Sequence, residues 1–328
     1  MTLHELLPAG VRQTELHRHL DVSIRSATLL EFLKQQGLEP ESTTLHLFQP
    51  RVWLKRPMSD LPSVLNLFQT FQKVFRSPEI CSRVAYEVVE DCFHEGTRRV
   101  ELRYSPGFVS EFTGLDWQAA LDGFHDGLVR AIRDLPDRME AGLLCIASRD
   151  YGVEAASKTV QFFLRNQDKF VGMDLAGNEL NWPTELFRDA FRPARDAGAR
   201  LTIHAGEASG PDQMWEAIEG IGATRIGHGV ACVRDPRLME ELARRAICLE
   251  ICPTSNWLTQ CVPSIEEHPL PRILRAGVPV CVNTDDPGVF DVTLPSEMEL
   301  CRTRMGVTES EVKQLLAHAW NYSFLGRA

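Results

Sequence analysis

Eight short β-like runs recur along the chain, and each is followed by a stretch with helical periodicity. The runs cover residues 14–20, 98–104, 142–148, 170–176, 200–205, 224–229, 246–252 and 278–284. Strands that alternate with helices in this way indicate parallel βαβ units. Because eight such units close a barrel, we predict an α/β fold of the (β/α)8 TIM-barrel class instead of an open sheet.

We expect residues 1–328 to form a single barrel domain, because no repeat, low-complexity tract or linker marks a boundary. Residues 21–97, between the first and second runs, are far more than one crossover helix needs. This helical insertion leaves the carboxyl end of the first strand, so we predict that it covers the barrel mouth as a lid. Helices packed on the outside of the barrel are the alternative. The residues after the eighth run predict C-terminal helices.

Composition excludes several classes of partner and location. The formal net charge of −10 argues against a nucleic-acid or anionic-membrane partner. No apolar run approaches the roughly 20 residues that span a bilayer, and no secretory signal is visible, which predicts a cytoplasmic protein. The nine cysteines include no C-x-x-C pair, so we interpret them as buried free thiols, Cys248 and Cys252 included. Nothing in the composition selects an oligomeric state.

Histidine and aspartate side chains lie at the carboxyl ends of four of the runs. His17 and His19 end the first run, and alternation along a strand points both rings to one face. His204 ends the fifth run, and Asp285 follows the eighth. His228 lies at the end of the sixth run, and two further acidic side chains, Glu207 and Asp286, lie next to these residues in the sequence. Because barrel enzymes build their sites at this end of the strands, these residues predict a catalytic zinc site of a metal hydrolase.

A set of motifs spans the chain in a fixed order: HRHLD, VELRYSP, DLAGNE, TIHAGE, RIGHGV, LEICPTSN and NTDDP. In residues and order they resemble the adenosine deaminase family, from about residue 14 to the C terminus, and the last four motifs are highly specific. The resemblance implies zinc-dependent hydrolytic deamination of adenosine or 2′-deoxyadenosine to inosine or 2′-deoxyinosine and ammonia. It also implies one Zn²⁺ per chain and a small purine nucleoside as the binding partner.

The resemblance assigns roles to individual residues. The implied zinc ligands are His17, His19, His204 and Asp285. In the implied reaction, water attacks C6 of the purine, Glu207 protonates N1 as general acid, and His228 orients the water.

Three further residues are implied to hold the substrate. Asp286 would bond N7 of the purine, the backbone N–H of Gly177 would meet N3, and Asp21 would accept a hydrogen bond from the ribose. Adjacent strand residues face opposite ways, so Asp285 and Asp286 can act together only where the strand ends; the following Pro287 fits such an end.

Two positions depart from the family pattern. Val22 stands where the family usually has glycine, and its β-branched side chain predicts a remodelled ribose end of the pocket. Asn178 replaces the more usual aspartate of DLAGDE. Another 6-aminopurine, namely adenine, aminodeoxyfutalosine or a modified adenosine, therefore stays open as the substrate. Asp21 favours a nucleoside, because relatives acting on adenine or aminodeoxyfutalosine often carry glutamate there.

Other interpretations also stay open. Glu101 and Arg103 share a strand face and could touch substrate, although a structural ion pair inside the barrel is favoured. A binuclear amidohydrolase would need a lysine at the end of the fourth strand, whereas Lys169 precedes that strand. A non-catalytic purine-binding barrel would be marked by loss of a metal ligand or of the acid, and all are present.

Overall fold

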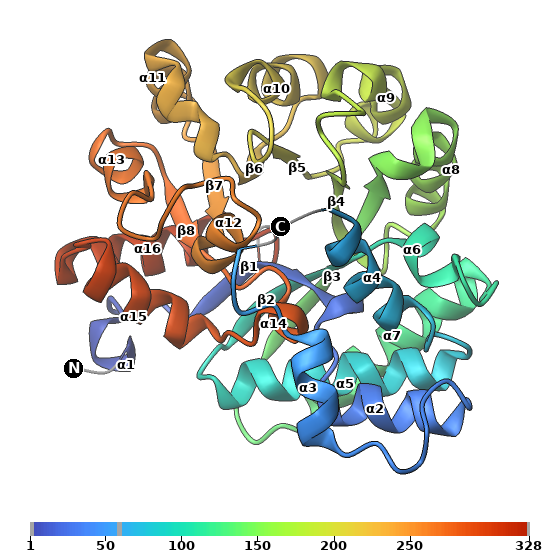
Figure 1. The fold of residues 1–328 in the computed structure, drawn as a ribbon. Helices are drawn as coiled ribbons and strands as arrows, with labels where there is room; N and C mark the ends of the chain where they lie inside the picture. Colours follow the sequence, from blue (N-terminus) through green and yellow to red (C-terminus); the bar gives the residue numbers. More distant parts are fainter. Residues whose placement is uncertain (1–2, 58–60, 327–328) are drawn as a thin grey trace.

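The computed structural model describes residues 3–57 and 61–326, without the side chains of His4 and residues 61–66. Its eight strands form one sheet in sequence order, and every neighbouring pair from first to last is parallel. They are β1 (Thr14–His19), β2 (Arg99–Tyr104), β3 (Glu140–Ser148), β4 (Phe170–Ala176), β5 (Leu201–Ala205), β6 (Arg225–His228), β7 (Cys248–Ile251) and β8 (Val280–Val282). Figure 1 shows these strands at the centre with the helices around them, which confirms the predicted (β/α)8 barrel.

The barrel closes between β8 and β1 through a side chain as well as the backbone. Asn283 Oδ1 accepts hydrogen bonds from the backbone N–H groups of Leu16 at 2.8 Å and His17 at 3.1 Å. Beyond it, Asp285 N donates to His17 O at 3.1 Å, and His19 N donates to Asp285 O at 2.8 Å. This seam places Asp285 beside the two histidines of β1, although the three are far apart in the sequence.

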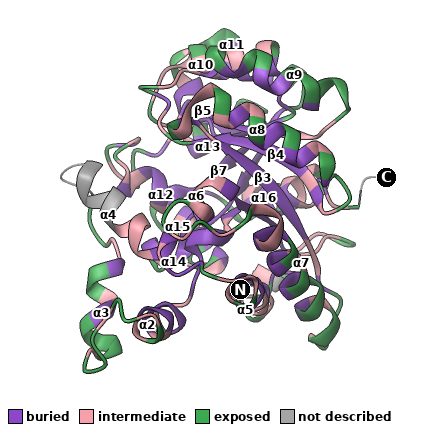
Figure 2. Ribbon diagram, turned by 90° about the vertical axis from the view of Figure 1, so that its right-hand side faces the viewer, coloured by how far each residue is buried: buried purple, intermediate pink, exposed green. Residues whose placement is uncertain are grey.

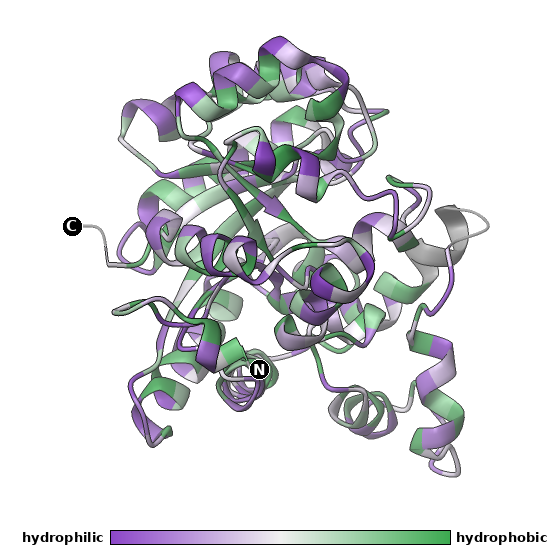
Figure 3. Cartoon of the chain, turned by 90° about the vertical axis from the view of Figure 1, so that its left-hand side faces the viewer, coloured by the Kyte–Doolittle hydropathy of each residue, from purple (hydrophilic) through white to green (hydrophobic). Residues whose placement is uncertain are grey.

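The helices pack their apolar faces on the strands and expose their polar faces. The strands are almost wholly buried, whereas the outer helices carry exposed residues on one side (Figure 2). Hydropathy follows the same division, with apolar strands inside helices of mixed character (Figure 3). The α-helices are α1 (Leu3–Leu6), α2 (Ser26–Gln35), α3 (Leu45–Val52), α4 (Leu61–Gln72), α5 (Pro78–His94), α6 (Pro106–Ser110), α7 (Trp117–Asp134), α8 (Gly152–Arg165), α9 (Arg188–Asp196), α10 (Pro211–Trp215), α11 (Pro236–Arg244), α12 (Pro253–Leu258), α13 (Leu270–Arg275), α14 (Pro287–Phe290), α15 (Leu294–Arg304) and α16 (Glu309–Tyr322).

The long insertion after β1 divides between the two positions that the sequence left open. Helix α5 packs against α7, as an ordinary crossover helix does. Helix α4 instead contacts α6 and the 3-10 turn η1 (Leu20–Val22), which follow β2 and β1 at the barrel mouth. Residues 58–60 of this segment lie outside the described residues, and the lid stays a prediction.

Helix α16 and residues 323–324 after it lie at the opposite, amino-terminal end of the barrel. Helix α16 packs on β1 and β8, in agreement with the predicted C-terminal helices. Glu101 of β2 accepts a hydrogen bond from Ser323 Oγ at 2.7 Å, and the Arg225 guanidinium stacks 3.6 Å from the ring centre of Phe324.

Two expectations drawn from composition can be compared with the structure. All nine cysteines are free, and eight of them are buried, including Cys248 and Cys252. Among the described residues, no helix has both the length and the apolar character needed to cross a membrane.

Candidate active site

The histidines and aspartates predicted from sequence converge at the carboxyl ends of the strands. Ligand atoms of His17, His204, His228 and Asp285 all lie within 4.8 Å of one another. The Nε2 atoms of His17 and His19 lie 3.1 and 3.2 Å from the same Asp285 oxygen, Oδ1. His17 Nε2 is fully buried yet makes no hydrogen bond of acceptable geometry. A ring nitrogen without a hydrogen-bond partner, surrounded by nitrogen and oxygen atoms that can serve as metal ligands, fits a site for a divalent metal.

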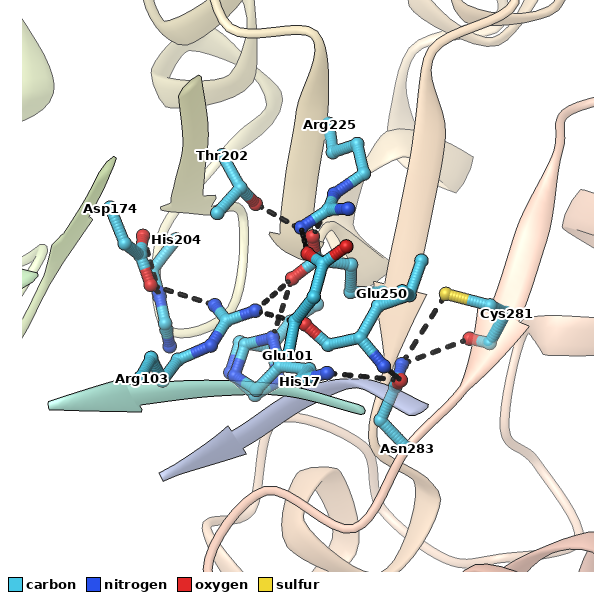
Figure 4. Close-up of polar contacts among 12 residues, drawn as sticks. His17, Glu101, Arg103, Asp174, Thr202, His204, Arg225, Glu250, Cys281 and Asn283 are labelled. Atoms are coloured by element: carbon cyan, nitrogen blue, oxygen red, sulfur yellow. Dashed lines mark hydrogen bonds and ion pairs between the residues drawn. The ribbon is translucent and has the colours of Figure 1, made fainter. Parts of the chain in front are cut away.

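Two of these histidines are held from behind by buried carboxylates. His17 Nδ1 lies 2.8 Å from Glu250 Oε2, and His204 Nδ1 lies 3.0 Å from Asp174 Oδ1. Because a carboxylate only accepts hydrogen bonds, each Nδ1 carries the proton and each Nε2 presents a lone pair to the site. Arg103 joins the two carboxylates, donating at 2.7 Å to Asp174 Oδ2 and at 2.7 Å to Glu250 Oε2 (Figure 4).

The same network continues down the inside of the barrel. Arg225 Nε donates to Glu250 Oε1 at 2.6 Å, and its Nη2 donates to Glu101 Oε2 at 2.6 Å (Figure 4). Thr202 Oγ1 also donates to Glu250 Oε1, at 2.8 Å. Glu101 and Arg103 therefore have structural roles, as favoured above. They form separate ion pairs, Glu101 with Arg225 and Arg103 with Asp174 and Glu250.

The backbone is strained at two of the converging residues. His228, which ends β6, has φ = +59°, and Asp285, three residues after β8 ends, has φ = +64°. A positive φ is uncommon for residues other than glycine and costs on the order of 1–3 kcal/mol. Such strained residues persist where the surrounding structure holds a sharp turn that directs a side chain into a functional site. The turn at Asp285 also provides the strand ending that Asp285 and Asp286 require.

Glu207 faces the same group of side chains. Its Oε2 lies 3.6 Å from His228 Nε2, which is also 3.8 Å from Asp285 Oδ2. Burial raises the pKa of the Glu207 carboxyl, and the nearby Asp285 adds to the rise while His228 opposes it. Glu179 holds the loop in place by accepting from the backbone N–H of Glu207 at 3.4 Å and of Ser209 at 3.2 Å.

The remaining predicted substrate residues lie around this group. Asp286 is 8 % exposed and belongs, with His19 and Asp285, to a second cluster of possible ligand atoms. Asp21 is buried and accepts a hydrogen bond from Ser105 N at 3.1 Å; burial raises the pKa of its carboxyl to about 6. Gly177 has φ = +108°, and a Cβ there would lie 2.4 Å from Asp150 Oδ2. The positive φ and this close approach both favour glycine at position 177.

The two departures from the family pattern have simple structural explanations. Val22 is buried and packs within the main apolar core. Asn178 Oδ1 accepts from Leu180 N at 3.0 Å and from Asn181 N at 3.1 Å, contacts that an aspartate oxygen would also make. The turn after β4 is thus preserved.

Sequence reasoning missed several residues that support the site. Asp174 and Glu250 are lone carboxylates inside the apolar runs FVGMDLA and AICLEIC, and that contrast was the available signal. Arg149 donates to His204 O at 2.7 Å and gave no such signal. His268, which lies in no recognisable sequence motif, is buried; its Nε2 lies 3.3 Å from Asn256 Oδ1, and Asn256 in turn contacts His228.

Comparison with known proteins decides the family. The adenosine deaminase family profile matches residues 12–328. The chain belongs to the adenosine deaminase family. An adenosine deaminase from Vibrio cholerae is 37 % identical over 320 residues, covering 98 % of this chain and 95 % of that protein. This chain is therefore an aminohydrolase of a metal-dependent family, and its buried His/Asp cluster fits that chemistry.

Solved structures agree with the family assignment. An amidohydrolase from Burkholderia ambifaria with bound zinc matches with a TM-score of 0.86 at 26 % identity, covering 98 % of this chain and 87 % of that one. The N6-methyl-AMP deaminase of Arabidopsis thaliana matches with a TM-score of 0.82 at 29 % identity, covering 98 % and 94 %. Nucleoside and nucleotide substrates are thus both represented among the relatives.

Proposed function

We propose that this enzyme catalyses the zinc-dependent hydrolytic deamination of adenosine and 2′-deoxyadenosine to inosine, or 2′-deoxyinosine, and ammonia. The observation that carries the proposal is the convergence of His17, His204 and Asp285 beside the carboxyl group of Glu207. Relatives named adenosine deaminase, matched over nearly their whole length, support it. The free thiols would remain reduced in the cytoplasm, where we expect the enzyme to act.

One Zn²⁺ per chain would be held by His17, His19, His204 and Asp285. The carboxylates behind His17 and His204 leave both Nε2 lone pairs free, and the unsatisfied His17 Nε2 gains a partner when metal binds. Zinc in such a site lowers the pKa of a bound water enough to make a nucleophile available at neutral pH. The zinc bound by the Burkholderia ambifaria relative supports the choice of metal.

Glu207 and His228 would carry the proton and charge transfers. Addition of water at C6 breaks the C6=N1 double bond and leaves negative charge on N1 unless N1 is protonated as the C–O bond forms. Glu207 suits this step because burial raises its carboxyl pKa and so favours the protonated form. His228 would stabilise the charge that develops on the attacking oxygen, from its position between Glu207 and Asp285.

Three residues would position the substrate. Asp286 would hydrogen-bond N7, the N–H of Gly177 would meet N3, and Asp21 would accept a hydrogen bond from the ribose. The carboxylate of Asp150, which lies against Gly177, adds a second acid to this side of the pocket. A 5′-phosphate on the ribose would meet like charges there, which disfavours a nucleotide substrate. The α4 part of the 21–97 insertion would cover the mouth.

A comparison of substrates tests this proposal. We expect kcat/KM for adenosine and 2′-deoxyadenosine to exceed the values for adenine, AMP and N6-methyl-AMP by at least about tenfold, because the acidic ribose side selects a neutral sugar. The ultraviolet change from adenine-type to hypoxanthine-type absorbance measures each rate, with the Glu207→Gln variant as the control for contaminating deaminase. A higher kcat/KM for AMP or adenine would replace the nucleoside assignment with that substrate.

A further inference from the structure

His268, in the loop before α13, begins a chain of hydrogen bonds that leads to His228. His268 Nδ1 accepts from the backbone N–H of Leu270 at 3.1 Å. A backbone N–H can only donate, so this Nδ1 carries no proton and the ring holds its proton on Nε2. Burial also lowers the pKa of His268 to about 3, which keeps the ring neutral.

The proton on His268 fixes the orientation of Asn256, in α12. His268 Nε2 lies 3.3 Å from Asn256 Oδ1, and because this nitrogen donates, the amide atom facing it must be the oxygen. The oxygen and nitrogen of a side-chain amide are otherwise hard to distinguish. Here the backbone N–H of Leu270 can only donate, so it fixes the His268 tautomer and, through it, the orientation of the Asn256 amide. Asn256 Nδ2 then faces His228 Nδ1 at 3.0 Å.

We propose that His268 and Asn256 are positioning residues that hold His228 in the tautomer with its proton on Nε2. The amide NH2 of Asn256 can only donate, so His228 Nδ1 must accept and the ring proton lies on Nε2. That nitrogen is the one directed at the site, 3.6 Å from Glu207 Oε2. His228 thereby offers a hydrogen-bond donor to the reacting oxygen in place of a lone pair to the metal.

The same logic separates His228 from the histidines around it. His17 and His204 have carboxylates at Nδ1, which leave lone pairs on Nε2, whereas His228 has an amide donor at Nδ1. All three present a nitrogen within the same 4.8 Å cluster with Asp285. The partner behind each ring therefore decides which histidine binds metal and which donates. The catalytic role of these hydrogen bonds rests on the proposed deaminase function, whereas the tautomer of His228 does not.

The tautomer can be measured directly by ¹⁵N NMR of the zinc-loaded protein labelled at histidine nitrogens. We expect the His228 Nε2 resonance to be of the protonated type and its Nδ1 resonance to be of the unprotonated type. Assignment follows from the resonances that disappear in His228→Gln. A proton on His228 Nδ1 would overturn the proposal, whatever substrate the enzyme accepts, and failure to deaminate adenosine would leave this result standing.

Three variants test the function of the chain. Asn256→Asp offers His228 only an acceptor, which should move the ring proton to Nδ1 and lower kcat by about 100-fold, the usual effect of losing one oriented donor. KM should change by less than about threefold, because substrate contacts remain. His268→Gln can still accept from Leu270 and donate to Asn256, so kcat should stay within about threefold, whereas His268→Leu should lose about tenfold.

Zinc content and the His228 tautomer, measured on each variant, separate positioning from misfolding. We expect one zinc per chain throughout, with the shifted tautomer only in Asn256→Asp and a mixture in His268→Leu. Equal losses of kcat in His268→Gln and His268→Leu would contradict the proposal, as would an unchanged kcat in Asn256→Asp.

Discussion

Replacement of Glu207 by glutamine is expected to lower kcat for adenosine by about 1,000-fold or more, within the range of general acid catalysis. The amide keeps the shape of the side chain but cannot deliver a proton to N1. Zinc content should stay at one per chain, because Glu207 is not among the proposed ligands. Turnover followed by absorbance and metal analysis of the same sample measure both quantities.

A surface carboxylate provides the matched control for this variant. Glu185 is exposed and lies outside the cluster of converging side chains, so Glu185→Gln should leave kcat and zinc content unchanged. A Glu207→Gln protein that turns over within about tenfold of the wild type would remove Glu207 from the proton-transfer step.

Glu250→Gln is expected to have the largest effect on stability. Glu250 is fully buried and receives hydrogen bonds from Arg103, Arg225 and Thr202 while holding His17. Removing its charge leaves two buried guanidinium groups undercompensated, which should lower the free energy of unfolding of the metal-free protein by about 3–5 kcal/mol. Loss of the carboxylate behind His17 should also weaken zinc binding by about 10- to 100-fold.

Urea denaturation and competition with a chelator measure these two effects. The control is Glu266→Gln, which removes an exposed ion pair with Arg304 and should change stability by less than about 1 kcal/mol. Should Glu250→Gln prove as stable as Glu266→Gln and bind zinc equally well, the barrel network would not support the metal site.

The fold was predictable because strand periodicity and the placement of polar residues at strand ends agreed. The strand boundaries were less predictable: the eighth run was predicted as 278–284, whereas β8 covers only Val280–Val282. After Val282 the backbone turns so that Asn283 caps β1 through its side chain and Asp285 adopts a positive φ. Periodicity carries no information about such a turn. It also could not place α4 at the mouth and α5 outside, because both helices are amphipathic.

The residues of the candidate site were predictable where their own type and position in the sequence are informative. They were not predictable where the role depends on contacts with other residues. His17, His204 and Asp285 stand out at strand ends, and the structure brings them together. The partners that set their chemistry are recognisable only in three dimensions. The chain to His228 depends on a backbone N–H at Leu270, which no residue type reveals.

Metal removal and reconstitution test the central claim most directly. The protein is stripped with a chelator, and adenosine turnover is then measured as zinc is returned in known amounts. The account predicts no turnover in the stripped protein and a linear recovery that ends at one zinc per chain. Undiminished turnover without metal, or full zinc occupancy with no deamination of adenosine, would contradict it.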